Sequence, residues 1–188
     1  MKYKLKDGYT FTSDESLTLE VDYSILPDKI IKLSGYDEKD WEYLSAKPKG
    51  KKKATVLIGT LNKSWEEESL EEILKDSPLK FSGAWVREAY IRERPNYNNG
   101  SWFIGFPDPK TSRWRSVHYD YVDFPCLWCD DSERWHRSLN HVRSEWSASR
   151  RLCLLCESNL GTSALSENLD TLTLVIGGQK WEIQAKKI

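Results

Sequence analysis

The four cysteines of this 188-residue chain lie in two C-x2-C pairs, Cys126-Leu127-Trp128-Cys129 and Cys153-Leu154-Leu155-Cys156. Each pair can place two thiolates on one metal ion, and 23 residues separate the two pairs. Paired cysteines with this spacing are typical of tetrahedral zinc sites, so the sequence predicts one structural Zn2+ bound by four sulfurs. A site closed by four thiolates has no open coordination position, which indicates a structural role for the metal.

Two other interpretations of the cysteines stay open. Disulfide bonds would require an oxidising compartment, but residues 1–7 contain no apolar segment of the kind that directs secretion. We therefore expect a cytoplasmic protein. Four buried free thiols are the second alternative, because the residues inside each pair are apolar and cysteine is itself often buried.

The segment between the two pairs shows a helical pattern of apolar residues. Trp135, Leu139, Val142 and Trp146 are spaced by 4, 3 and 4, which predicts a helix from residue 133 to about 148. Asp131 or Ser132 would cap its N-terminus. The sequence thus predicts a helical insertion stabilised by zinc.

Residues 120–160 resemble the treble-clef and zinc-ribbon elements of known zinc proteins. The run from Arg151 to Glu157 is similar to the second knuckle of zinc-stabilised HNH modules, with Asn140-His141 as the nearest counterpart of the pair that precedes that knuckle. The resemblance implies a metal-dependent nuclease as an alternative function. Catalysis would then need convergent base and metal-binding groups, for which His118, Asp120 and His141 are the candidates.

Charge is balanced overall but uneven along the chain. The 28 Lys and Arg residues nearly cancel the 29 Asp and Glu residues, so net charge indicates no nucleic-acid partner. Residues 1–82 contain lysine and no arginine, whereas ten arginines lie between 87 and 151. We therefore divide the chain into a β-rich part, 1–82, and an Arg/Trp-rich part, 83–188, which together could form one continuous domain. No apolar run is long enough to span a membrane, and no motif indicates a small-molecule cofactor.

Period-two patterns predict strands over much of the chain. Residues 17–23 alternate apolar and polar side chains, and 9–12, 29–33 and 54–61 are shorter candidates. Between 81 and 122 we expect a three-stranded meander with a hairpin turn at Asn98-Asn99-Gly100. Residues 171–184 predict a final hairpin turning at Gly177-Gly178. The spacing of Ser64 and Glu67 predicts a capped helix over 65–75.

Arginine alternates with aromatic residues in the second half of the chain, for example at Arg113-Trp114-Arg115. Together with Arg137 and Arg143 on the expected helix, these residues form a candidate partner-binding surface. Guanidinium and indole groups are used both for nucleic-acid contacts and in protein interfaces, so the type of partner stays open. A sheet with tryptophans in the core and arginines in solvent would give the same pattern.

We therefore expect an α+β fold with antiparallel sheets, one or two docking helices and the zinc-stabilised insertion. The preferred function is a non-enzymatic, zinc-stabilised module or adaptor that binds a macromolecule, either protein or nucleic acid. The alternatives are the metal-dependent nuclease and a small inhibitor protein from a phage or mobile element.

Overall fold

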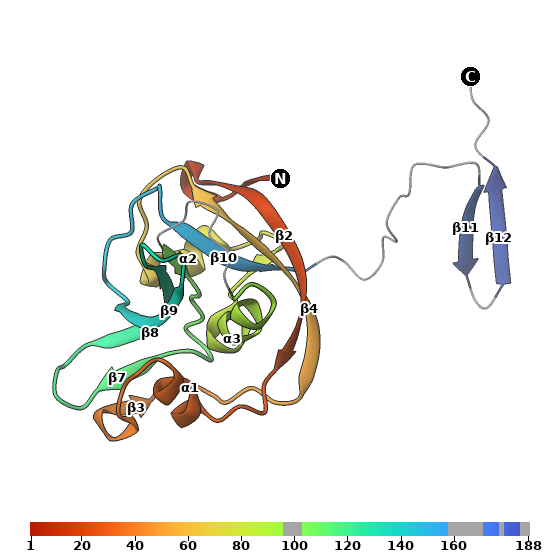
Figure 1. Cartoon of the computed structure of the whole chain (residues 1–188). Coiled ribbons are helices and arrows are strands. Elements are labelled where there is room, and N and C mark those ends of the chain that lie inside the picture. The colour runs from red at the N-terminus through yellow and green to blue at the C-terminus, as the bar shows by residue number, and fades with distance from the viewer. Residues whose placement is uncertain (96–102, 158–170, 177–178, 185–188) are drawn as a thin grey trace. The chain divides into compact units, whose positions relative to one another are not determined.

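The computed structural model describes residues 1–95, 103–157, 171–176 and 179–184 (Figure 1). Its contacts divide the chain into two units, Met1–Glu157 and Ser158–Ile188, and each is described by itself. The larger unit contains the strands β1 (Lys2–Lys4), β2 (Thr10–Asp22), β3 (Trp41–Tyr43), β4 (Lys51–Leu61), β5 (Leu79–Lys80), β6 (Phe103–Gly105), β7 (Trp114–Ser116), β8 (Val122–Cys129), β9 (Trp135–His141) and β10 (Arg151–Cys156). Its helices are α1 (Pro27–Leu33), α2 (Leu70–Ile73) and α3 (Gly83–Glu93), with 3-10 turns η1 (Lys6–Gly8), η2 (Glu38–Asp40) and η3 (Glu67–Ser69).

All ten strands of this unit belong to one mixed sheet. Its order is β1-β2-β4-β10-β6-β8-β7-β3, with β5 paired to β10 and β9 paired to β8. The pair β10 and β6 is parallel, and the other pairs are antiparallel. The expectation of an α+β fold with a helical insertion is therefore wrong, because a single large sheet dominates the described residues and the helices are short.

The central strands are buried on both faces of the sheet. Along β10, Cys153 and Leu155 contribute to one apolar cluster, and Leu152 and Leu154 to the other. β4 alternates in the same way, which explains why both strands are continuous apolar runs in the sequence. The first cluster contains residues of α1 and α3, and the second contains residues of α2, so helices cover both faces.

A bulge in β2 changes the face to which its side chains point. The pairing of β2 with β4 shifts between Ser13 and Glu15, and this extra residue inverts the alternation. Phe11 accordingly joins the cluster around α2, whereas Leu19 joins the cluster around α3. Gly59 of β4 pairs with Ser13 beside the bulge, where an added Cβ would lie 2.1 Å from the carbonyl oxygen of Thr12.

The expected meander over 81–122 is wrong in its first strand, because residues 83–93 form α3. Trp85, Val86, Ala89 and Tyr90 are all buried, and Figure 1 shows the long strands β2 and β4 curving around this helix. Apolar residues at i, i+1, i+4 and i+5 fit a helix that is buried on most sides. The hairpin turn expected at 98–100 lies outside the described residues.

The predicted helix over 133–148 is also wrong, because residues 135–141 form strand β9. Its apolar residues do not share one side: Trp135 and Leu139 belong to the cluster around α3, whereas Val142 and Trp146 belong to the cluster around α2. The expected cap is instead a hairpin turn, in which Asp130 Oδ1 accepts hydrogen bonds from the backbone N–H groups of Ser132 and Arg134. Residues four apart lie on the same face of a strand and also on the same side of a helix. The spacing of Trp135 and Leu139 therefore fits either structure.

Other local predictions had mixed outcomes. The strands over 17–23 and 54–61 are confirmed almost entirely, within β2 and β4. Residues 29–33 form part of α1, so their strand is wrong, and the helix over 65–75 is reduced to η3 and α2. In the smaller unit, β11 (Thr171–Ile176) pairs antiparallel with β12 (Gln179–Gln184), which confirms the final hairpin, although its turn at 177–178 lies outside the described residues. Within the described ranges, no helix has the length and apolar character needed to cross a membrane.

Candidate functional site

The structure does not bring the four cysteines together. Each C-x2-C pair lies on a strand, where residues three apart point to opposite faces. Cys129 and Cys153 consequently lie in the cluster around α3, and Cys126 and Cys156 in or against the cluster around α2. In this arrangement the four sulfurs do not fit one tetrahedral ion, and no group of three or more His, Cys, Asp or Glu residues suited to a metal occurs in the described part of the chain. The structural Zn2+ stays a prediction.

The cysteines have the environment of buried thiols. All four are free, and burial raises the pKa of Cys126 to about 12 and also raises the pKa of Cys153. The Cys153 thiol lies inside the core, and Cys126 faces Gly105 and Ser138 on the neighbouring strands. The Cys126 and Cys153 thiols are therefore protonated at neutral pH and pack as small apolar groups.

The histidines are separated from one another. His118 Nε2 lies 2.8 Å from Asp40 Oδ1, and His136 Nε2 lies 2.7 Å from Asp130 Oδ2. The His136 ring also stacks on Trp128, with 4.2 Å between ring centroids. His141 is the histidine that shares a pocket with Asp120, so the structure joins two of the three residues considered for a nuclease and places His118 elsewhere.

Each arginine of the expected partner-binding surface is paired with a glutamate. Arg113 bonds to Glu67 and Arg115 to Glu42, with N to O distances of 2.5 and 3.6 Å. Arg137 Nε donates to Glu88 at 2.7 Å, and Arg143 Nε donates to Glu68 at 3.4 Å. Trp114 is buried against Tyr43, so its indole belongs to the core. The charges of these four arginines are thus balanced within the chain.

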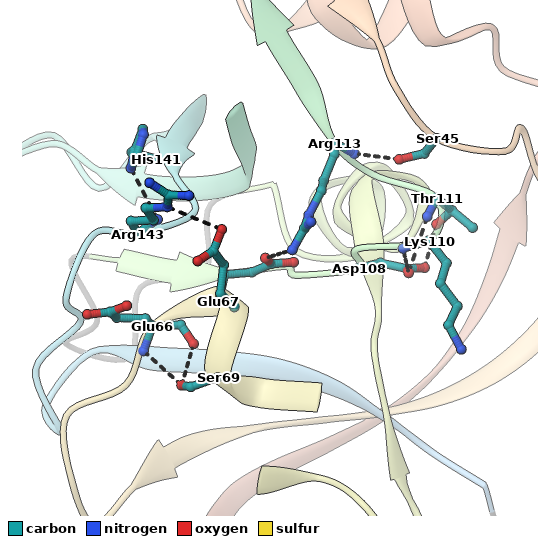
Figure 2. A network of polar contacts seen from close by, with 11 residues as sticks. Ser45, Glu66, Glu67, Ser69, Asp108, Lys110, Thr111, Arg113, His141 and Arg143 are labelled. Carbon is teal, nitrogen blue, oxygen red and sulfur yellow. Dashed lines mark hydrogen bonds and ion pairs between the residues drawn. The ribbon is translucent and has the colours of Figure 1, made fainter. Parts of the chain in front are cut away.

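Two of these ion pairs border a pocket of about 190 Å³, which we call the η3 pocket. Glu68 of η3 and Arg113 form one side, and His141, Val142 and Arg143 at the end of β9 form another. Asp120, Tyr121 and Val122 complete it from the loop between β7 and β8 and the start of β8. Figure 2 shows the glutamates of η3 between Arg113 and Arg143, which approach from opposite sides.

Local hydrogen bonds fix η3 in this position. Trp65 and Trp146 exchange both backbone hydrogen bonds, at 2.9 and 2.7 Å, and their rings lie 4.9 Å apart. The Glu67 N–H donates to the carbonyl of Val142, so the end of β9 holds η3 directly. Ser69 Oγ also accepts from the Glu66 N–H, which caps the turn (Figure 2). The side of the pocket formed by η3 is therefore preformed.

Glu67 is an unusual group beside the pocket, since it is charged and only 1% exposed. Burial raises the pKa of its carboxyl above the ordinary value, and the hydrogen bond from Arg113 offsets part of this rise. One carboxylate oxygen, Oε1, has no hydrogen-bond partner within the described chain. Because a buried carboxylate needs a counter-charge, Arg113 is committed to Glu67.

An exposed aromatic surface adjoins the pocket. We define the aromatic tip as Val117, Tyr119 and Tyr121, in the loop between β7 and β8. Val117 is 56% exposed and Tyr119 is 64% exposed. The rings of Tyr119 and Tyr121 are stacked, with 5.4 Å between centroids, and Tyr121 makes an edge contact with His141 at 5.6 Å. Sequence analysis missed this surface, because the alternation of residues 117, 119 and 121 indicates a strand, whereas these residues form a bent loop in which the Tyr121 N–H donates to the Tyr119 carbonyl.

The tip is held in place by η2. The Val117 N–H donates to the carbonyl of Asp40, whose carboxylate also contacts His118. Tyr121 packs edge-on against Trp41 at the start of β3, with 6.4 Å between ring centroids. Two elements distant in sequence thus position the exposed side chains.

Comparison of the chain with models of known protein families, with curated proteins and with solved structures finds no match.

Proposed function

We propose that this chain is a non-enzymatic module that binds another protein through the aromatic tip and the adjoining η3 pocket. Large apolar side chains that are more than half exposed are costly in water, and here two lie next to each other on one ordered loop. Tyrosine is enriched in protein interfaces because its ring supplies contact area and its hydroxyl a hydrogen bond. The tip therefore has the composition of the centre of an interface.

The pairing of the arginines favours a protein over a nucleic acid. Binding to phosphates gains free energy from counterion release, which requires clustered and unneutralised Lys or Arg side chains. Arg113 and Arg143 line the adjoining pocket and Arg115 lies on β7, yet each is paired with a glutamate of the chain itself. A surface of balanced charges and exposed aromatic rings suits a protein partner.

The fixed position of the tip supports the same proposal. The hydrogen bond that the Val117 N–H donates to the Asp40 carbonyl, together with the packing of Tyr121 against Trp41, orders the loop before any partner arrives, so binding would cost little conformational entropy. We propose the cytoplasm as its compartment, because four free cysteines, three of them buried, suit a reducing environment.

Site-specific photo-crosslinking tests this function. A photoreactive amino acid replaces Tyr119 in the full chain, and a control chain carries it at Leu33, which is 40% exposed and lies in α1. Exposure to light in an extract of the source cells should yield a discrete protein adduct from position 119 and none from position 33. The adduct should survive nuclease treatment and should disappear when Val117→Ser is added.

Two results would contradict the proposal. Equal labelling from positions 119 and 33 would show that the tip has no preferred partner. Adducts that nuclease removes would instead identify nucleic acid as the partner, and binding should then weaken steeply as salt rises.

A further inference from the structure

The η3 pocket is too small for a typical small-molecule ligand but suits one side chain. Its volume of about 190 Å³ lies below the roughly 300–1,000 Å³ of ligand pockets. It opens beside Tyr121, which is part of the aromatic tip. A protein segment that crosses the tip would therefore pass the mouth of the pocket.

We propose that the η3 pocket receives an arginine side chain of the partner protein, an inference that rests on the proposed protein-binding function. The charges that line the pocket carry the argument. Arg113 is bonded to Glu67, which Figure 2 shows, and Arg143 is bonded to Glu68. Neither arginine needs an anion from outside.

Asp120 is the charged group of this pocket that lacks a partner. Within the described ranges of the chain it makes no hydrogen bond and no ion pair, although it lines the pocket. Three carboxylates, those of Glu67, Glu68 and Asp120, thus stand against the two guanidinium groups at and behind the pocket. Charge complementarity therefore selects a cation as the occupant.

The remaining lining favours arginine among cations. Val122 and Val142 supply apolar surface for the aliphatic part of a long side chain. Tyr121 adds an aromatic wall, and the carboxylate of Asp120 can accept two parallel hydrogen bonds from a planar guanidinium. These contacts together match the stem, the plane and the charge of arginine.

Nuclear magnetic resonance of the full chain labelled with 15N tests the inference. The probes are Nα-acetylarginine N-methylamide, the corresponding citrulline derivative, which is neutral but similar in shape, and the corresponding glutamate derivative. We expect the arginine probe to shift the amide resonances of residues 120–122 and 141–143 in a saturable way. Asp120→Asn should weaken this binding about tenfold. The control Asp131→Asn, an exposed carboxylate at the other end of the β8–β9 hairpin, should leave it unchanged.

Three outcomes would overturn the inference: equal binding of arginine and citrulline probes, tighter binding of the glutamate probe, or full binding by the Asp120→Asn chain. The absence of any saturable shift counts against it as well. None of these results affects crosslinking from position 119, so the proposed function can survive the loss of the arginine pocket. Conversely, binding of the arginine probe without crosslinking at position 119 would support arginine binding in the pocket but would contradict the proposed role of the aromatic tip in protein binding.

Discussion

Glu88→Gln should destabilise the fold strongly, because Glu88 neutralises two arginines at the contact between α3 and β9. Glu88 Oε1 accepts from Arg87 Nε at 3.0 Å, and Oε2 accepts from Arg137 Nε at 2.7 Å. The Arg87 side chain is fully buried, and its other nitrogens donate to the Ser138 carbonyl and to Ser34 Oγ, both at 2.9 Å. Burial lowers the pKa of Arg87 and the charge of Glu88 raises it.

The expected loss follows from the burial of this charge. An amide at position 88 keeps the shape of the side chain but leaves the guanidinium of Arg87 without a counter-ion. Removing one partner of a buried ion pair costs about 3–5 kcal/mol, out of a total stability of about 5–15 kcal/mol for a typical domain. The matched control is Glu42→Gln, since Glu42 is 58% exposed and lies 3.6 Å from Arg115. Exposed pairs of this kind contribute about 0–1 kcal/mol.

Urea denaturation followed by tryptophan fluorescence measures both variants. With a slope of about 1–3 kcal/mol per molar urea, the midpoint should fall by at least about 1 M for Glu88→Gln and should barely move for Glu42→Gln. The double variant Arg87→Met with Glu88→Leu should recover much of the loss, because apolar side chains can replace a buried ion pair. If Glu88→Gln cost no more than Glu42→Gln, the assignment of Arg87, Glu88 and Arg137 to a structural network would be refuted.

Three further predictions follow from individual residues. Burial raises the pKa of Asp123 from 3.8 to about 6, so the folded state binds this proton more tightly than the unfolded state and stability should fall as pH rises from 3.8 to about 6. Asp123→Asn should remove that slope and add about 3 kcal/mol at pH 7, at about 1.4 kcal/mol per pKa unit, as measured by urea titrations at several pH values. An unchanged slope would contradict the buried position of the carboxyl. Elemental analysis of protein purified without added metal checks the predicted zinc. One ion per chain that is lost in Cys153→Ser would support four-thiolate binding, and the strands that carry the cysteines would then have to rearrange. Four titratable thiols without zinc would instead support the buried-thiol interpretation. Incubation of the chain with single- and double-stranded nucleic acid in Mg2+ or Mn2+ should give no cleavage, because His118 is paired with Asp40 and does not line the pocket that Asp120 and His141 share. Cleavage abolished by His141→Ala would establish the nuclease.

Strands whose faces differ in polarity could be predicted from the sequence, and strands buried on both faces could not. Residues 17–23 alternate because one side of β2 packs on the core and the other is accessible, and the alternation identifies the strand directly. β10 shows no alternation, since Leu152, Cys153 and Leu154 are all fully buried. Without a polar face, periodicity cannot separate a central strand from a buried helix.

The C-x2-C motif shows how the same spacing has different consequences in different backbones. In a zinc knuckle a tight turn brings both sulfurs to one side, but in an extended strand residues three apart point in opposite directions. Cys129 therefore packs in the apolar cluster around α3, and Cys126 packs in the cluster around α2. Tertiary pairing of β8 with β6, β7 and β9 determines this outcome, and none of those pairings is encoded within the motif itself.

The concentration of arginine between residues 87 and 151 has a structural explanation that limits the functions open to this surface. Lysine presents a compact, strongly hydrated charge, whereas the planar guanidinium of arginine can be buried and can bond to several groups at once. Arg87 does so inside the core, whereas Arg113 remains partly exposed and bonds to a glutamate that is itself buried. Arginine occurs here because the charges lie at contacts between elements, where glutamates of α3 and η3 meet strands from the second half of the chain. In the proposed complex, a partner at the aromatic tip would meet arginines that are already paired, and Asp120 is the carboxylate of the η3 pocket that has no partner among the described residues.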